Sequence, residues 1–391
     1  MNMIFVHDNK FSRYNGQVYS YGHFAYDLLW KRYLKYFDHI EAGGRFLNAS
    51  EEDCKTLSIS SGDNVSFFEL PDLASIKGLM YLRKAKNEIK VHMKNADFAV
   101  IRLHSFLGYV ACSVARKLGI NYAVEVVGCA KDAYGNYNLK GKIISPITVH
   151  FQKKCVRKAP NVIYVSRHFL QERYPNKHFN VGCPDCNVPL TDEFVLHQRI
   201  SKIEVMDVKK EIRIGLIASL KVGYKGHDTA IKAMSYLKDK YPNMRICFLG
   251  DGSPDKWMPL VKKFGVENNI EFCGSLLGGD PVLHWIDDLD IFIMPSLQET
   301  LGRALVEAMS RGCPAIGGAE TAVPEQLPDD CIHERKNAKQ LADMIDYMLS
   351  HKSYMKLCAE ENFVRAKKYS EEILEEKRDY FWKTAIANGK K

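Results

Sequence analysis

Two glutamates with seven residues between them are the strongest candidates for chemistry in this 391-residue chain. Glu299 lies in a polar turn after the apolar run 290–294, and Glu307 lies about one turn into an amphipathic helical segment. Gly302 and its neighbours would present unpaired backbone N–H groups at the start of that helix, where a phosphate binds well. One carboxylate can line a cleft mouth while the other accepts hydrogen bonds from sugar hydroxyl groups. Taken alone, such a pair is more often a surface glutamate and a helix-face glutamate without a role in binding.

The surroundings of the pair resemble a known enzyme family. The strand, turn and helix resemble the Glu-(seven residues)-Glu signature of the retaining glycosyltransferases of family four, a large group with the GT-B fold. Three upstream segments, 214–233, 248–254 and 269–276, resemble the same family in the same order. The resemblance covers most of residues 211–320 and, more loosely, the first half of the chain. The matching positions of the signature are Glu299, Gly302, Arg303, Ala304, Glu307, Ala308, Met309 and Gly312.

The resemblance implies a nucleotide-sugar donor site in the second half. Lys225 falls where the family has a lysine on the donor diphosphate, and Glu299 would hold the donor sugar while Glu307 holds the ribose. Many members have an arginine before this lysine; here Lys221 is the nearest basic substitute, directed either at the phosphates or at solvent. The resemblance implies Gly302, Arg303, Ala304 and Leu305 beside the leaving diphosphate. It implies Gly250 in the preceding strand-turn, and Gly274 and Leu276 at the nucleotide base.

The first half resembles the acceptor domain of transferases that build bacterial capsule, exopolysaccharide or O-antigen repeats. Gly16 lies in a polar loop after the first strand, which is expected close to the cleft on the acceptor side. His104 is a candidate catalytic residue at a strand end, with a structural hydrogen bond as the alternative. Glu125, also near a strand end, either binds a sugar hydroxyl or pairs with a nearby Arg or Lys. The segments that carry this resemblance are 7–38, 101–128 and 164–175.

Elements that alternate along the chain must position these residues. Short apolar strands alternate with helical patterns in both halves, which predicts α/β domains with parallel sheets and crossover helices. Together with the resemblance, this predicts a GT-B fold of two Rossmann-like domains that face a central cleft. Clear periodicity is lost at roughly 187–210, where we expect the domain boundary. The expected parts are an acceptor-binding domain at 1–190, a linker at 191–210, a donor-binding domain at 211–368 and a C-terminal helix at 369–391 that packs on the first domain.

Composition narrows the class of protein. Hydrophobic residues make up 46% and charged residues 26%, which is typical of a chain that folds nearly end to end. The start of the sequence is typical of a buried strand and not of a signal peptide, and no apolar run approaches the roughly 20 residues of a membrane span. Eleven cysteines scattered through apparent strands are typical of a reducing compartment, which predicts a cytoplasmic protein.

The charge of the chain suggests its partners. The net charge of +8 suits phosphate-bearing ligands or an anionic membrane, whereas no nucleic-acid-binding signature is found, so nucleic acid is not an expected partner. The basic amphipathic segment 138–159 is typical of a helix on an anionic membrane surface, or of a core helix with a solvated basic face. We favour the membrane, because a polyprenyl-linked acceptor would require access to it. This predicts peripheral contact with the inner face of the plasma membrane.

Two short sequence patterns resemble metal-binding motifs, but we do not expect either to bind a metal. Asp288 and Asp290 precede an apolar strand, a usual place for solvated acids, and the GT-B group does not generally need a bound metal. Cys183 and Cys186 have zinc-like or redox-like spacing, but without a second pair they are expected to be buried or idle thiols. No metal or cofactor is therefore expected besides a nucleotide sugar as co-substrate.

These observations converge on one function. We expect a hexosyl- or N-acetylhexosaminyltransferase that moves a sugar from a UDP- or GDP-sugar, with retained configuration, to a glycan or polyprenyl-linked saccharide in cell-surface polysaccharide biosynthesis. The mechanism implied by the resemblance is front-face attack by the acceptor hydroxyl, assisted by the departing phosphate. The alternatives are a non-catalytic GT-B subunit that binds nucleotide sugar or glycan, and a nucleotide-sugar epimerase.

Overall fold

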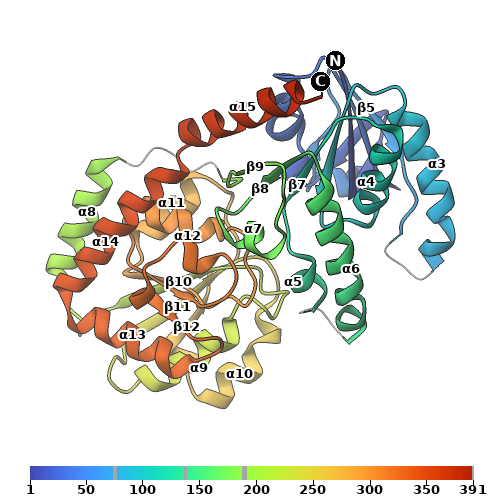
Figure 1. The fold of residues 1–391 in the computed structure, drawn as a ribbon. Helices are drawn as coiled ribbons and strands as arrows, with labels where there is room; N and C mark the ends of the chain where they lie inside the picture. The colour runs from blue at the N-terminus through green and yellow to red at the C-terminus, as the bar shows by residue number, and fades with distance from the viewer. Residues whose placement is uncertain (74–76, 136–138, 187–191, 390–391) are drawn as a thin grey trace. The chain divides into compact units, whose positions relative to one another are not determined.

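The chain forms two compact units, and Figure 1 shows their elements. The computed structural model describes residues 1–73, 77–135, 139–186 and 192–389. The units are Met1–Cys183 with Glu376–Lys391, and Pro184–Glu375. Within the described ranges, no helix combines the length and the apolar character needed to cross a bilayer.

The sheet of the first unit is parallel across most of its width. Its strands are β1 (Asn2–Tyr14), β2 (Gln17–Ser20), β3 (His39–Asn48), β4 (Ser58–Ile59), β5 (Val65–Glu69), β6 (Phe98–Leu103), β7 (Tyr122–Val126), β8 (Asn161–Tyr164) and β9 (Phe179–Gly182). The parallel strands run in the order β5-β3-β1-β6-β7-β8-β9, while β2 and then β4 pair antiparallel beside the second half of β1. Strands β6 and β7 are buried along their whole length, as expected where helices cover both faces of a sheet.

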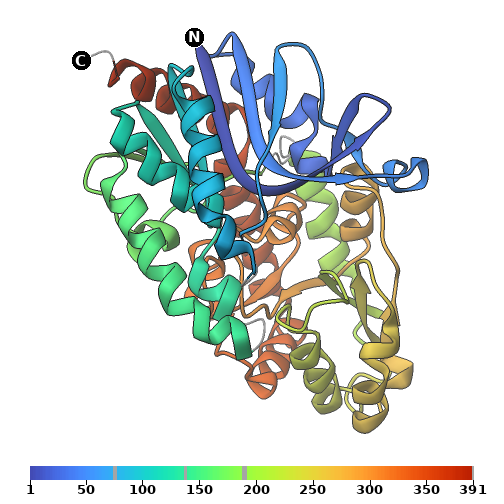
Figure 2. The same cartoon turned by 90° about the vertical axis from the view of Figure 1, so that its right-hand side faces the viewer.

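Helices flank this sheet. They are η1 (Gly22–Phe24), η2 (Tyr26–Trp30), α1 (Lys31–Leu34), α2 (Glu51–Cys54), η3 (Lys77–Tyr81), α3 (Leu82–Met93), α4 (Phe106–Leu118), α5 (Ala130–Gly135), α6 (Leu139–Lys158), α7 (Phe169–Arg173) and α15 (Glu371–Ala387). Helices α3 and α6 pack on either side of α4 (Figure 2). Ser105 begins α4 by accepting the N–H of Gly108 at 2.9 Å, and Gly119 ends it with a φ of +69°.

The C-terminal helix α15 packs on the first unit through aromatic residues. Trp382 is 1% exposed, and its ring meets Tyr33 edge-on with centroids 5.4 Å apart and Phe37 at 6.2 Å. Asn121 ties the end of the helix by donating to the carbonyl of Ala385 at 2.8 Å. Edge-to-face packing of large rings buries much apolar area, so the end of the chain completes the core of its first half.

The second unit has an entirely parallel sheet among its described strands. These are β10 (Ile212–Ile217), β11 (Met244–Leu249), β12 (Ile270–Phe272), β13 (Ile291–Met294), β14 (Ala315–Gly318) and β15 (Ile332–His333), in the order β12-β11-β10-β13-β14-β15. The helices that cover it are α8 (Glu193–Val205), α9 (His227–Leu237), η4 (Pro254–Lys256), α10 (Met258–Phe264), η5 (Glu267–Asn269), α11 (Asp280–Asp287), α12 (Arg303–Ser310), η6 (Val323–Glu325), η7 (Asp329–Cys331), α13 (Ala338–Ser350), α14 (Lys352–Ala366) and η8 (Lys367–Tyr369).

A helix stands where the sequence predicted a linker. Most of 191–210 is α8, which begins at Asp192, whose side chain accepts the N–H of Phe194 at 2.9 Å. Buried Arg199 holds this helix to the second unit by donating to the carbonyls of Ile286, at 2.9 Å, and Leu289. The weak periodicity of the segment hid the helix because a buried arginine, not an apolar stripe, provides much of its docking. Residues 187–191, also expected at the boundary, lie outside the described residues.

Candidate functional site

Three neighbouring strands of the second unit end at one edge of the sheet, and the loops beyond them carry the main candidates. Strand β10 pairs with β13, and β13 with β14, all parallel, so their carboxyl ends lie together. Lys225 follows β10, Glu299 follows β13 and Thr321 follows β14. In open α/β sheets this edge is where ligands bind.

Lys225 and Glu299 form a short ion pair. Their Nζ and Oε1 atoms are 2.5 Å apart, and the side chains are 24% and 12% exposed. The loops that carry them are joined as well, because the N–H of Leu297 donates to the carbonyl of Tyr224 at 2.7 Å. The structure therefore brings together the two residues that the sequence proposed for the donor sugar and the diphosphate. Partial burial strengthens the pair relative to one in water.

Gly302 begins helix α12 in a conformation that favours glycine. Its φ is +72°, and a Cβ there would lie 3.2 Å from both the Oε1 of Gln326 and the Sδ of Met294. The amide of Gln326 donates to the carbonyl of Leu301 and so fixes the turn. The first N–H groups of a helix have no intrahelical acceptor, which leaves those of Arg303 and Ala304 suited to an anion.

Leu305 does not fit its predicted place in the phosphate-binding turn. Its N–H donates to the carbonyl of Gly302 at 3.0 Å, and its side chain is fully buried. The sequence placed the phosphate-binding turn at Gly302 to Leu305, but the helix has already closed its first hydrogen bond at Leu305. Its contribution is to the core and not to a ligand.

Glu307 lies on the same helix, one turn after Arg303. Its carboxylate is mostly buried, with 22% of the side chain exposed, and its Oε1 is 3.8 Å from the Nη2 of Arg303. Burial raises the pKa of Glu307, while Arg303 opposes that rise. A carboxyl group held in this way is suited to accept hydrogen bonds from the hydroxyl groups of a bound ligand.

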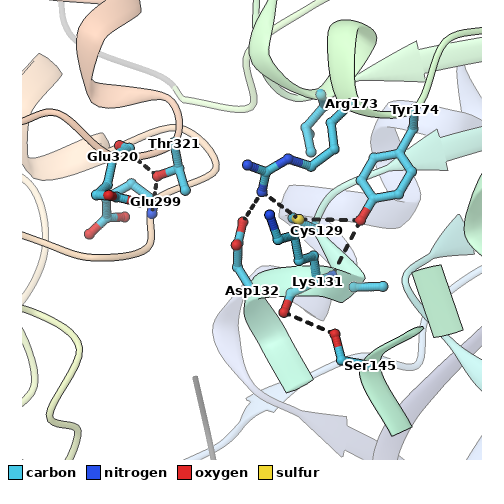
Figure 3. Close-up of polar contacts among 12 residues, drawn as sticks. Cys129, Lys131, Asp132, Ser145, Arg173, Tyr174, Glu299, Glu320 and Thr321 are labelled. Carbon is cyan, nitrogen blue, oxygen red and sulfur yellow. Dashed lines mark hydrogen bonds and ion pairs between the residues drawn. The ribbon is translucent and has the colours of Figure 1, made fainter. Parts of the chain in front are cut away.

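Thr321 was missed by the sequence analysis. It has a φ of +59°, a conformation that is strained for a β-branched residue. Its Oγ1 accepts the N–H of Glu299 at 2.7 Å and donates to the carbonyl of Glu320 at 2.8 Å, as Figure 3 shows. The N–H of Ala322 also donates to the carbonyl of Glu299 at 3.1 Å. These contacts fix the backbone of Glu299, and a lone threonine after a strand gives no local signal of them.

Replacing Thr321 with valine is expected to lower kcat/KM for the donor by about tenfold. Valine keeps the branched shape but removes the Oγ1 that accepts the Glu299 N–H, and a lost hydrogen bond of about 1.4 kcal/mol corresponds to that factor. The matched change Thr321→Ser keeps the oxygen and should stay within about threefold of wild type. Steady-state kinetics of both variants, with melting temperatures as a check on folding, decide the point. Equal activity of the two would show that the hydrogen bond does not position Glu299.

The predicted base-side residues lie in loops beside this edge. Gly250 is packed so closely that a Cβ would lie 2.0 Å from the carbonyl oxygen of Ala218, and its N–H donates to the carbonyl of Gly274 at 2.6 Å. Gly274 has a φ of +70°, and Leu276 is 44% exposed. The loops after β10, β11 and β12 are thus tied together through backbone atoms, with Leu276 left accessible.

Lys221 points toward a carboxylate of the same unit. Its Nζ lies 2.7 Å from the Oδ2 of Asp251, and both side chains are more than half exposed. The hydrogen bond from Lys221 is the main reason that the pKa of Asp251 is lowered. Of the two directions left open by the sequence, the structure shows Lys221 at the protein surface in an exposed ion pair, which is a weak interaction in water.

In the first unit, His104 follows β6 and lies against the next strand-end loop. A Cβ on Gly128 would be 2.3 Å from its Nδ1, so the glycine makes room for the ring. Burial lowers the pKa of His104, which keeps the imidazole neutral at neutral pH. A neutral imidazole offers one donor and one acceptor, as a hydroxyl-binding residue requires.

The loop beside His104 is held by a cluster that the sequence analysis did not find. Arg173 donates from Nη1 to the Oδ2 of Asp132 at 2.6 Å and to the Sγ of Cys129 at 3.2 Å (Figure 3). Gln152 of α6 bridges the same loop, donating to the carbonyl of Gly128 at 2.8 Å and accepting the N–H of Ala130 at 2.9 Å. These hydrogen bonds hold the loop next to His104 in place. Only the tertiary fold joins these distant positions.

Glu125 is a structural residue, the second of the two interpretations that the sequence left open. Its Oε1 accepts the hydroxyl of Tyr33 at 2.5 Å and its Oε2 accepts the Nε of Arg102 at 2.8 Å. The side chains of Glu125 and Arg102 are 11% and 8% exposed. Both carboxylate oxygens are bound inside the core, which corrects the assignment of Glu125 to the acceptor side.

Replacing Glu125 with glutamine is expected to destabilise the protein by about 3–5 kcal/mol, because the buried guanidinium of Arg102 loses the carboxylate charge that compensates it. Chemical unfolding of the variant measures this loss. As a control, Glu211→Gln removes a half-exposed carboxylate that lies near Arg213 and Arg245, and should cost less than about 1 kcal/mol. A Glu125 variant as stable as the control would show that the buried pair does not hold the fold.

The polar loop that carries Gly16 is a β-hairpin turn. The first strand continues to Tyr14, and Asn15 and Gly16, with φ values of +45° and +75°, make a tight turn into the antiparallel strand β2. Both central residues with positive φ are typical of a two-residue hairpin turn, for which Asn-Gly is the preferred pair. Gly16 thus forms the tip of a β-hairpin at the end of β1, and its place on the acceptor side stays a prediction.

Groups of metal-ligand type have structural partners. Cys247, Glu271 and Cys273 offer atoms within 4.8 Å of one another and are the one such group found in the described part of the chain. The Oε2 of Glu271 also lies 3.5 Å from the Nη1 of Arg213. The positive charge of this arginine disfavours binding of a metal cation at the same carboxylate. Asp290 is buried and accepts the backbone N–H of Arg213 at 2.8 Å, so it is a structural acid and not the solvated one that the sequence predicted. Cys183 and Cys186 are buried.

Comparison with known proteins identifies the chain. Residues 211–351 match the family model described as glycosyl transferases group 1. Protein CapJ of Staphylococcus aureus is 33% identical over 374 residues, which are 94% of this chain and 90% of CapJ. The chain belongs to the glycosyl transferases group 1 family. It is a glycosyltransferase, as its sequence predicted.

Two further relatives extend this comparison. The amylovoran biosynthesis glycosyltransferase AmsK of Erwinia amylovora is 26% identical to the transferase over 168 residues, 40% of each chain. The crystal structure of Anabaena Alr3699/HepE in complex with UDP covers 98% of this chain and 100% of its own, with a TM-score of 0.67 and 14% identity. The transferase has the GT-B fold, as predicted from its sequence.

Proposed function

We propose that the protein is a retaining glycosyltransferase that moves a sugar from a UDP- or GDP-sugar to a glycan or polyprenyl-linked saccharide in cell-surface polysaccharide biosynthesis. The observation that carries the proposal is the pairing of Lys225 with Glu299 at 2.5 Å, at the sheet edge where helix α12 begins. A cation, a helix N-terminus and a carboxylate are the groups that a diphosphate and a sugar require. The UDP bound by HepE and the amylovoran biosynthesis of AmsK support this choice of donor and pathway class.

In this proposal the second unit stabilises the leaving group. The bond between the anomeric carbon and the diphosphate oxygen breaks, and negative charge grows on the diphosphate next to Lys225 and the N–H groups of Arg303 and Ala304. Fixed donors aimed at developing charge are a major source of rate enhancement. Glu299 would hold the hydroxyl groups of the donor sugar, and Glu307 those of the ribose.

Retention is proposed to follow from attack on the same face of the sugar. The acceptor oxygen forms its bond to the anomeric carbon on the side that the diphosphate leaves, and its proton passes to the departing phosphate oxygen. A double displacement would need two carboxylates around the anomeric carbon. Here Glu307 is assigned to the ribose, and Glu125 is held by Arg102 and Tyr33, so neither is available as a second carboxylate.

The first experiment measures nucleotide diphosphate release across a panel of UDP- and GDP-sugars, with membrane lipid extract as acceptor. Release with one donor that requires the extract, together with an NMR spectrum showing that the product keeps the anomeric configuration of the donor, would support the proposal. Inversion would contradict retention. Conversion of a nucleotide sugar without any acceptor would favour an epimerase, and nucleotide binding without turnover a binding subunit.

A further inference from the structure

Helix α6 carries an exposed apolar ridge. Ile143, Ile147 and Phe151 are 73%, 56% and 44% exposed, and their spacing of four residues places them on one side of the helix. Exposed large apolar side chains in a continuous row are unusual on a surface that meets only water. Phe151 is anchored at its base by Tyr109 of α4, whose ring is stacked at 6.0 Å. The ridge is therefore a fixed feature of the helix.

The same helix is basic. The sequence 139–158 contains no Asp or Glu, and the exposed cations of the helix surround or follow the ridge. Apolar side chains together with basic ones are the composition of helices that lie in the interface of an anionic bilayer. The exposed basic residues are Lys142, Lys153, Lys154, Arg157 and Lys158.

A second apolar group lies at the start of α3. Met80, Tyr81 and Leu82 are 78%, 50% and 45% exposed, and the basic residues Arg83 and Lys84 follow them. Helix α3 joins β5 to β6, and α6 with α5 joins β7 to β8, so both helices begin near the carboxyl edge of the parallel sheet. Both helices pack against α4, which lies between them and also begins at the carboxyl edge (Figure 2). That edge also carries His104.

We infer that the exposed side of α6 and the start of α3 form a docking surface for an anionic lipid bilayer. The surface consists of the ridge on α6, its basic residues, and Met80 to Leu82; we call it the α3/α6 surface. It rests on the proposed function, because a polyprenyl-linked acceptor presents its saccharide at a membrane. Docking through this surface holds the acceptor edge of the first unit near that saccharide.

Charge distinguishes a bilayer from a second copy of the chain. A two-fold interface through the α3/α6 surface would bring the cations of α6 against those of its partner, and like charges in contact repel. Anionic headgroups neutralise them, so each basic residue near the surface favours binding. The bilayer interior accepts the isoleucine and phenylalanine side chains, whereas Lys153 and Lys154 remain at the headgroups.

The test is vesicle co-sedimentation of the full chain without donor or acceptor. Wild type is expected to bind phosphatidylglycerol-containing vesicles and to bind pure phosphatidylcholine at least tenfold more weakly. The double change Lys153→Glu/Lys154→Glu should weaken binding by at least about tenfold, and Ile143→Ser/Ile147→Ser by a similar factor. Matched controls are Lys262→Glu/Lys263→Glu and Leu357→Ser/Val364→Ser, exposed pairs of the same types in the second unit, which should bind as wild type.

Separate measurements distinguish this inference from the proposed function. Nucleotide diphosphate release should be unchanged in the α6 variants with a detergent-dispersed acceptor, so loss of vesicle binding alone supports the inference. The inference would be overturned if the wild type does not bind anionic vesicles, or if the α6 variants bind them as well as their controls do. Either result would count whether or not the enzyme transfers sugar. A concentration-dependent dimer in light scattering that Ile143→Ser/Ile147→Ser abolishes would also overturn it, in favour of a second copy.

Discussion

Replacing Glu299 with glutamine is expected to lower kcat/KM for sugar transfer by about 10²- to 10³-fold, the range found when one preorganised electrostatic group is removed from an active site. The glutamine keeps the size of the side chain but loses the charge that faces Lys225 at 2.5 Å. In the proposed mechanism it also weakens the hydrogen bonds to the donor sugar. Initial rates of nucleotide diphosphate release over a range of donor concentrations measure the effect.

Glu320→Gln is the matched control for this prediction. Glu320 lies in the neighbouring loop, but its carboxylate meets Arg335 at 2.9 Å on the surface of the unit. Its loss should change kcat/KM by no more than about threefold, as expected for a partly exposed ion pair. If both variants lose activity equally, the integrity of the loops, and not the Glu299 carboxylate, would account for the result.

Replacing Lys225 with methionine is expected to have an effect of the same size, about 10²- to 10³-fold in kcat/KM, because in the proposed mechanism the leaving diphosphate loses the cation that stabilises it. Nucleotide diphosphate binding, measured by calorimetry, should weaken as well. Lys221→Met is the comparison, since Lys221 is 68% exposed and pairs with Asp251. Its loss should cost about threefold or less. Equal losses would show that general positive charge, and not the position of Lys225, serves the diphosphate.

The double variant Lys225→Met/Glu299→Gln tests whether the two residues act together. Residues that act as one unit give effects that are far from additive. We therefore expect the double variant to lose much less activity than the product of the two single losses. Fully multiplicative losses would mean that the ion pair seen in the structure has no part in the reaction.

The sequence predicted the site of the second unit because its signals are local. A buried strand, a polar turn, a glycine and an amphipathic helix follow one another between 290 and 310, and each has a pattern that short-range physics dictates. Local order of this kind is independent of the rest of the fold. The same alternation of strand and helix, repeated in both halves, predicted α/β domains with parallel sheets, and the resemblance to family four implied the GT-B fold.

The sequence predictions differ from the structure where a residue or segment is compatible with two local conformations. Gly16 follows Asn15, and the same polar stretch fits a loop or a hairpin until β2 pairs with β1. Segment 191–210 looked like a linker because Arg199, a charged residue, is the one buried against the carbonyls of Ile286 and Leu289. The N–H of Leu305 makes the first hydrogen bond of helix α12. A sequence pattern does not locate a helix start to within one residue, so this bond was not predicted.

The sequence by itself predicted the alternation of strand and helix in both units and the residue types of the candidate site in the second unit. Only the tertiary structure decided the partners. Thr321 reaches Glu299 because β13 and β14 are neighbours in the sheet, and Glu125 binds Arg102 because β6 and β7 are. Residues far apart in the chain meet by strand pairing, which depends on the whole core. Their side chains carry no local signal of the contact, so their roles appear only once the sheet has formed.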